Sequence, residues 1–151
     1  MQWKHKLLLL IQESLKIINT NNGYYYFTDQ LKHDNSKVVK FPRTINSYPF
    51  SNGGQNSLRI SLDGHYQIIY TDFYQKSGQF VIHDATNGNE LFVIKLDNQS
   101  DWSPITINAT VPINVDNSFG FVEIQMWIIT KNNAILDGAG FSSFYIKYLH
   151  T

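Results

Sequence analysis

Residues 57–70 read SLRISLDGHYQIIY, and this stretch decides the fold class. Apolar side chains recur at every second residue on both sides of the dipeptide Asp63-Gly64, at residues 58, 60 and 62 and at residues 66, 68 and 70. A period of two is typical of a β-strand with one buried face, and Asp-Gly between two such runs favours a tight reversal. We therefore expect a β-hairpin here, in a sheet with one apolar face.

A second hairpin is predicted further along the chain. Residues 79–83 (QFVIH) and 91–95 (LFVIK) are short apolar runs, and the loop between them contains Asn87-Gly88. Apolar runs of this length, separated by turn-forming residues, are typical of paired antiparallel strands. The sequence therefore predicts a hairpin over residues 79–95.

Further strands are predicted by alternation and by aromatic or β-branched composition. Residues 105–111 alternate and are expected to stop at Pro112, and residues 121–129 are apolar on both faces, as in a central strand. The other candidates are residues 23–28, 38–41 and 143–149. About eight or nine short strands favour an all-β fold, an antiparallel β-sandwich of the jelly-roll type.

The front of the chain has a different period. Its apolar side chains recur at intervals of three and four, at Trp3, Leu7, Leu10, Ile11, Leu15 and Ile18. This spacing predicts one N-terminal amphipathic helix over residues 3–18, ended by the Asn-rich segment before Gly23. We expect the helix to pack on the sandwich or on a neighbouring subunit; association with a membrane surface is the alternative.

The chain has 151 residues, the size of one compact domain. Within it we expect the helix and a connecting segment over residues 1–56 and the β-sandwich over residues 57–151. The boundary falls where proline, glycine, serine and asparagine become frequent, in the segment that ends at Asn56.

Charge and composition exclude several classes of protein. Twelve basic and twelve acidic residues give a formal net charge of zero, so no positive field collects nucleic acid. The chain contains no cysteine, which excludes disulfides and thiolate metal sites. The apolar run near the N-terminus is too short for a signal peptide or a transmembrane helix, so we expect a soluble chain without membrane insertion.

No motif supports catalysis or a cofactor. The five histidines lack the spacing of a preformed metal pair, and the sequence has neither a serine elbow nor a phosphate-binding glycine loop. Most Asp residues fall in predicted turns, where they accept hydrogen bonds from nearby backbone. We expect a non-enzymatic protein without a cofactor. The alternatives are a loop metal site, pairing His83 with Asp84 or Asp63 with His65, and a hydrolase with dispersed carboxylates.

Aromatic residues suggest a second function, because aromatic rings form the platforms on which sugars stack. They make up 15% of the chain. Tyr70, Tyr74 and Trp102 lie in or near predicted loops and strand ends. A monomeric carbohydrate-binding domain that uses these three residues is the alternative function. In the simpler interpretation, the same side chains fill a core or a subunit interface.

Three segments together resemble the jelly-roll domain shared by the globular head of the first complement component and the tumour necrosis factor ligands. Residues 62–68 (LDGHYQI) are similar to that family's Gly-x-Tyr-x-Phe pattern at the start of a strand. Residues 78–96 resemble its following hairpin, and residues 140–149 resemble its closing aromatic strand. Residues 115–120 stand where the family usually has a Gly-Asp turn, and the front helix lies outside the family pattern.

Small trimeric jelly rolls of this type occur in phage and virus particles as decoration, fibre and receptor-binding modules, and the front segment resembles short connector and tail proteins of bacteriophages. The resemblance therefore implies a virion structural or host-attachment protein that assembles with other virion proteins or with copies of itself. It implies a trimer with aromatic side chains along the three-fold axis and with loops free to meet a host-surface glycan. The assembly residues expected on this basis are Trp3, Leu7, Leu10, Ile11, Leu15, Phe121, Trp127, Phe144 and Tyr148.

Overall fold

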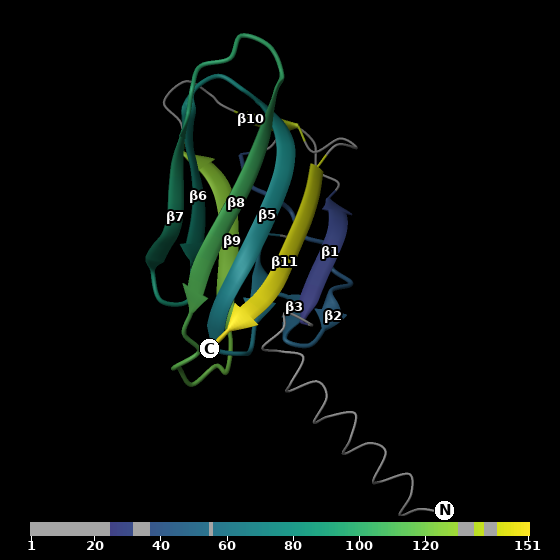
Figure 1. Cartoon of the computed structure of the whole chain (residues 1–151), viewed down its shortest axis with the longest axis vertical. Coiled ribbons are helices and arrows are strands. Elements are labelled where there is room, and N and C mark those ends of the chain that lie inside the picture. Colours follow the sequence, from purple (N-terminus) through teal and green to yellow (C-terminus); the bar gives the residue numbers. More distant parts are fainter. Residues whose placement is uncertain (1–24, 32–36, 55, 130–134, 138–141) are drawn as a thin grey trace, which may run out of the picture.

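The computed structural model describes residues 25–31, 37–54, 56–129, 135–137 and 142–151 (Figure 1). Within these ranges the chain forms β-strands and no helix, so none of the described residues belong to a helix that could cross a membrane. The strands are β1 (Tyr26–Leu31), β2 (Asn46–Ser47), β3 (Phe50–Asn52), β4 (Leu58–Ile60), β5 (Gly64–Gln75), β6 (Gly78–Asp84), β7 (Asn89–Leu96), β8 (Ser103–Ile113), β9 (Val122–Ile129), β10 (Ile135–Asp137) and β11 (Ser142–His150).

The strands form two antiparallel sheets. Sheet A has the order β1-β11-β5, with β8 pairing along the length of β5 and the short β10 pairing with its far end. Sheet B has the order β2-β3-β4-β9-β6-β7. Figure 1 shows β8, β5, β11 and β1 side by side in one layer, with sheet B behind them. This arrangement is a β-sandwich.

The strand pairing is nested. β1 pairs with β11, β4 with β9, β5 with β8, and β6 with β7. The first of these strands thus pairs with the last, the second with the second from last, and so on to the central hairpin. Such nesting is that of one long antiparallel hairpin folded over on itself, which is the jelly-roll topology. The predicted all-β antiparallel sandwich is confirmed.

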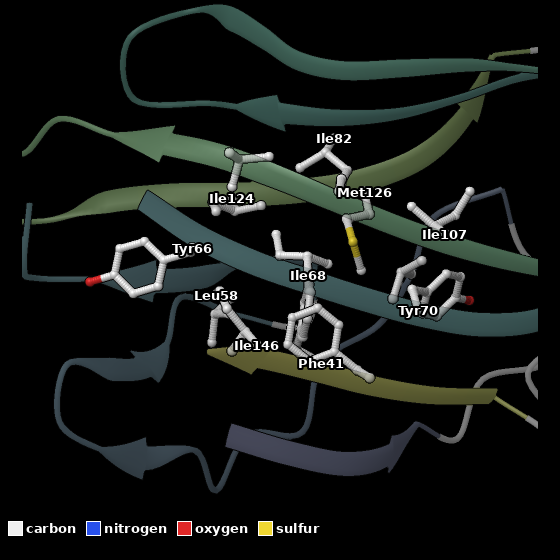
Figure 2. Close-up of a cluster of buried hydrophobic side chains, with 14 of the residues drawn as sticks. Phe41, Leu58, Tyr66, Ile68, Tyr70, Ile82, Ile107, Ile124, Met126 and Ile146 are labelled. Carbon is white, nitrogen blue, oxygen red and sulfur yellow. The ribbon is translucent and has the colours of Figure 1, made fainter. Parts of the chain in front are cut away.

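The core lies between the two sheets, because alternate residues of β5 and β9 are buried. Figure 2 shows the interleaved inner side chains of Tyr66, Ile68, Tyr70, Ile107 and Ile146 from sheet A and of Leu58, Ile82, Ile124 and Met126 from sheet B. Tyr70 stacks on Phe80 across the core, with ring centroids 5.5 Å apart. Removal of this apolar surface from water is the main force that holds the two sheets together.

The described segment before β4 is built into the sandwich. β1 extends sheet A, and β2 and β3 extend sheet B. Val39, Phe41 and Phe50 are buried in the core, and Phe41 packs edge-to-face on Phe144 with ring centroids 5.1 Å apart. The helix predicted over residues 3–18 lies outside the described residues.

The hairpin predicted over residues 57–70 is wrong, although both of its strands are present. β4 pairs with β3 and β9 in sheet B, whereas β5 pairs with β8 and β11 in sheet A. Alternation shows which face of a strand is buried, but not which strand lies beside it. The turn therefore crosses between the sheets. It requires glycine at Gly64, where φ is 151° and a Cβ would lie 2.4 Å from Tyr148 Cε2.

The hairpin predicted over residues 79–95 is confirmed as β6 and β7. The central strand predicted over residues 121–129 is confirmed as β9, which lies between β4 and β6. Residues 38–41 contribute an isolated bridge between Val38 and Trp127 instead of a strand.

The strand predicted over residues 105–111 is part of β8, but it does not stop at Pro112. The strand continues to Ile113, and Pro112 pairs with His65. A proline is tolerated there because β8 is an outer strand, and its nitrogen can point away from the neighbouring strand.

Candidate functional site

The outer face of sheet B carries a row of apolar side chains. Val93 on β7 pairs with Val81 on β6, and Val81 pairs with Trp127 on β9. Phe80 and Ile82, the neighbours of Val81 along β6, belong to the core, so alternation directs Val81 outward. Val81 is nevertheless fully buried. The middle of this outer face is therefore closed to water.

His83 and Trp127 pack together beside this row. Their ring centroids lie 4.9 Å apart, with the planes at 51°. The Nδ1 atom of His83 is buried, and within the described part of the chain it has no hydrogen-bond partner. Such a polar atom is rare in proteins, and it is expected where a surface completes its contacts with water or with another molecule.

Exposed apolar residues border the same row. Val93 and Ile129 expose 43% and 45% of their surfaces. Ile129 pairs with Gln79, two residues before Val81, so it shares the outer face. We call the side chains of this group the Trp127 face: Val81, His83, Val93, Trp127 and Ile129. Apolar surface exposed in this way is typical of protein contact sites.

A charged pair lies at the other end of the same outer face. Arg59 on β4 and Glu123 on β9 are cross-strand partners, and Arg59 Nε donates a hydrogen bond to Glu123 Oε1 over 2.9 Å. The Arg59 guanidinium also lies over the Phe121 ring, with Cζ 4.2 Å from its centroid. Phe119, 68% exposed, packs on Phe121. This end of the face therefore adds aromatic surface beside a pair whose charges cancel.

Two of the predicted assembly residues lie on this surface. Trp127 is half-buried at the centre of the Trp127 face, and Phe121 is half-buried beneath Arg59. Phe144 and Tyr148 are each only 1% exposed, because alternation along β11 turns them into the core, where they offer no surface to a neighbouring chain. Five further assembly residues lie outside the described residues: Trp3, Leu7, Leu10, Ile11 and Leu15.

The three predicted glycan-binding residues have different surroundings. Tyr70 is buried inside the long strand β5, and Tyr74 is buried one residue before the end of that strand. The Tyr70 hydroxyl donates to the Asp72 carboxylate, and the Tyr74 hydroxyl donates to the Asp97 carbonyl over 3.0 Å. Burial, together with the Asp72 carboxylate, raises the pKa of Tyr70 well above its usual range. Neither ring has a free face for a sugar, whereas Trp102 is half-buried just before β8.

Asp84 and Asp63, the carboxylates of the two alternative loop metal sites, each hold a loop in place. Asp84 accepts the backbone N–H groups of Thr86 and Asn87, each over 2.9 Å, in the turn between β6 and β7. Asp63 accepts the backbone N–H of Val115. Across the described ranges, no three His, Asp or Glu side chains form a group that could hold a metal ion.

Sequence reasoning missed the Trp127 face, although residues 79–83 and 91–95 carry a signal for it. Each contains an unbroken apolar run, FVI in the first and LFVI in the second. A strand with one solvated face alternates, so an unbroken run indicates burial on both faces. The first run is buried on both faces, since Val81 is fully buried between the core residues Phe80 and Ile82, whereas Val93 in the second run stays 43% exposed.

Comparisons with known proteins give distant structural similarity alone. No family model and no curated protein match the sequence. The chain is similar to the PRD1 vertex protein P5, at 9% identity and a TM-score of 0.43, over 87% of this chain and 92% of that chain. It is similar to the C-terminal CBM6 of LamC from Zobellia galactanivorans (13% identity, TM-score 0.39, 82% and 99% coverage) and to CBM6cm-2 of Cellvibrio mixtus lichenase 5A (12%, 0.32, 83% and 95%). TM-scores this low carry no inference about function, and these similarities do not confirm the resemblance to complement and tumour necrosis factor domains.

Proposed function

We propose that this chain is a non-enzymatic structural or attachment module of a virus or phage particle, and that the Trp127 face binds other proteins of the particle. The proposal depends chiefly on one observation: the outer face of sheet B is apolar at its centre, with Val81 fully buried and Val93 and Ile129 exposed. The jelly-roll architecture, which virus capsid proteins use, and the sequence resemblance support the virion setting.

The Trp127 face has the composition of the centre of a protein interface. Aromatic and branched apolar side chains dominate it, and the charged Arg59–Glu123 pair lies toward its border. Tryptophan contributes a large share of the binding free energy where a partner buries it. A formal net charge of zero gives nucleic acid no long-range attraction to the chain.

The test compares purified particles that contain altered chains. We expect Val93→Glu and Ile129→Glu each to reduce the amount of chain in particles by about tenfold, because a partner would bury the new charge, while circular dichroism stays native. Tyr48→Glu is the matched control, since Tyr48 is exposed in the turn between β2 and β3. Normal incorporation of both variants, or particles without the native chain, would contradict the proposal.

The helix predicted over residues 3–18 supplies a second proposed contact with the particle. Its apolar stripe has the spacing of a helix that docks on a neighbour. Deletion of residues 1–22 should leave the sandwich folded and remove the chain from particles. A truncated chain that is incorporated normally would rule out this contact.

Carbohydrate binding is the second candidate function, and it depends on Trp102. Its half-buried indole lies beside Asp101, which accepts the Trp102 backbone N–H over 2.8 Å, and an aromatic ring beside a carboxylate suits a sugar. A glycan array would support this function if binding were reproducible and were lost in Trp102→Ala. No binding by the native chain would remove it.

A further inference from the structure

β8 forms one edge of sheet A. It pairs with β5 without a register shift from Ser103 opposite Tyr74 to Ile113 opposite Gly64. Among the described residues no strand pairs with its other side, and Figure 1 shows β8 at the side of the sheet opposite β1. An edge of this length exposes backbone N–H and C=O groups that can pair with another strand.

The two prolines of β8 show which backbone groups face the open edge. In an antiparallel ladder, the N–H and C=O of alternate residues point toward one neighbour and then the other. Pro104 and Pro112 have no N–H to donate to β5, so their positions belong to the outward set. The outward residues between them are Thr106, Asn108 and Thr110.

The hydrogen bonds of β11 give the same direction. The Tyr148 N–H donates to the Tyr25 carbonyl on the β1 side over 2.8 Å. Tyr66, opposite Tyr148 on β5, therefore turns its backbone groups toward β8, where it pairs with Val111. Odd-numbered residues of β8 thus bond to β5, and even-numbered residues face the open edge.

β8 lacks two features that protect natural edge strands, and its two prolines, which are a third such feature, stand near its ends and leave residues 105–111 unprotected. It contains no charged residue and no bulge against β5. The long edge strand of sheet B, β7, is different, since it carries Glu90 and Lys95 and its pairing with β6 shifts register after Ile82. The even-numbered side chains of β8 are exposed on the outer face of sheet A, whereas the odd-numbered ones from residue 105 to residue 113 are buried in the core.

The sequence of β8 is nearly symmetric about its centre. Residues 104–112 read PITINATVP: proline at each end, threonine third from each end, asparagine in the middle and an apolar residue at every position between. A strand of this kind is complementary to itself in the antiparallel direction. With Asn108 on a two-fold axis, Thr106 lies opposite Thr110 of the second copy, and the prolines end the ladder on both sides.

We propose that β8 pairs with β8 of a second copy of this chain, antiparallel and centred on Asn108, so that two copies of sheet A join into one continuous sheet. The three outward residues of each strand would exchange about six backbone hydrogen bonds. Threonine pairs directly opposite each other stabilise a sheet further, and an uncharged strand meets no like charge across the axis.

The pairing leaves the Trp127 face free, so it goes beyond the proposed function and can fail independently of it. A single strand pair buries less than the roughly 1,000 Å² of a stable interface. The dimer is therefore concentration-dependent, and assembly in a particle would favour it by raising the local concentration.

The test uses two double variants of the full chain that add charge at the same two exposed positions. Thr106→Glu with Thr110→Lys sets opposite charges against each other across the two-fold axis, whereas Thr106→Glu with Thr110→Glu sets like charges there. By sedimentation equilibrium the native chain should form dimers, and the dimer Kd of the second variant should exceed that of the first by roughly tenfold or more.

Circular dichroism should first show that both variants are folded. Hydrogen exchange then gives an independent measurement of the β8 pairing. Backbone amides of Thr106, Asn108 and Thr110 should become protected as concentration rises, while the amide of Ile107 stays protected throughout. A native chain that stays monomeric at all concentrations, a trimer, or two variants with equal Kd would overturn the proposal.

Discussion

Sheet A turns tyrosine side chains into the core and carries both polar and apolar side chains on its outer face, whereas sheet B is almost entirely apolar inside and is apolar at the centre of its outer face. The inner side chains of sheet A include Tyr66, Tyr70 and Tyr148, and its outer face carries Gln67 and Asn108. The inner face of sheet B is almost entirely apolar, and its outer face is apolar at the centre. The two sheets of the sandwich therefore differ in the side chains on both their inner and their outer faces.

Because of this difference, the two sheets offer different kinds of contact surface to a partner. The outer face of sheet A is exposed along β8 and half-buried along β5, and the open backbone edge of this sheet lies on the uncharged strand β8. Sheet B has a charged and bulged edge strand, and its apolar surface lies on the face. An edge recognises another strand through backbone hydrogen bonds, whereas a face recognises shape and apolar surface.

The largest expected effect separates the two outer faces. Val81→Asp puts a carboxylate where the native side chain is fully buried, and we expect a loss of about 3 kcal/mol or more in the free energy of unfolding. Gln67→Asp, on the outer face of sheet A, removes one exposed hydrogen bond to Asn108 and should cost less than about 1 kcal/mol. Urea unfolding measures both. Equal losses would show that the two outer faces do not differ in burial.

Alkaline pH should act mainly through sheet A. Burial raises the pKa of Tyr66 and Tyr70, and the Asp72 carboxylate adds to the effect at Tyr70. Unfolded tyrosines lose their protons near pH 10, whereas these two stay neutral in the folded chain. Unfolding therefore releases protons from these tyrosines, so their contribution to the free energy of unfolding should be constant below about pH 9 and fall above about pH 10.

Two matched variants assign this pH dependence to a sheet. Tyr70→Phe loses the hydrogen bond to buried Asp72, which should cost about 1–3 kcal/mol at neutral pH, and it should make the alkaline fall shallower. Phe80→Leu alters the ring that stacks on Tyr70 from sheet B, and it should lower stability equally at every pH. Urea unfolding between about pH 7 and pH 11 tests this. An unchanged alkaline slope in Tyr70→Phe would show that Tyr70 has no part in it.

Sequence alone predicted the strands of this sandwich better than their neighbours. The alternation in residues 57–70 identified two strands and their buried faces, because successive side chains of a strand point to opposite faces and only one of these faces is in the core. It did not identify their partners, because β4 and β5 have the same period whether they pair with each other or face each other across the core. The turn at Gly64 carries the chain between the sheets and has the composition of a hairpin turn.

The candidate site was harder to predict for the same reason. Tyr70 and Tyr74 were expected in or near loops and strand ends, but β5 continues well past Tyr70 and ends only one residue after Tyr74, and period two turns both side chains inward. Trp127 was expected on a contact surface, and it is half-buried on the outer face of sheet B. The residues that surround it, Val81 and Val93, come from other strands, and only the pairing of β6 with β7 and β9 brings them together.

The smallest expected effect compares one cross-strand pair on the outer face of each sheet, the pair of sheet B being partly buried. In sheet B the Arg59–Glu123 ion pair joins β4 to β9, and in sheet A Gln67 donates to Asn108 over 3.1 Å between β5 and β8. Glu123→Gln should cost at most about 1 kcal/mol at low salt and almost nothing near 1 M salt, because dissolved ions screen exposed charges.

Gln67→Ala should also cost at most about 1 kcal/mol, but its cost should not change with salt, since neither partner is charged. Urea unfolding of dilute protein at low and high salt separates the two variants. A salt-independent loss in Glu123→Gln would mean that the carboxylate acts through hydrogen-bond geometry and its hold on Arg59 over the Phe121 ring, and not through its charge. The charge of this ion pair would then contribute little to the stability of sheet B.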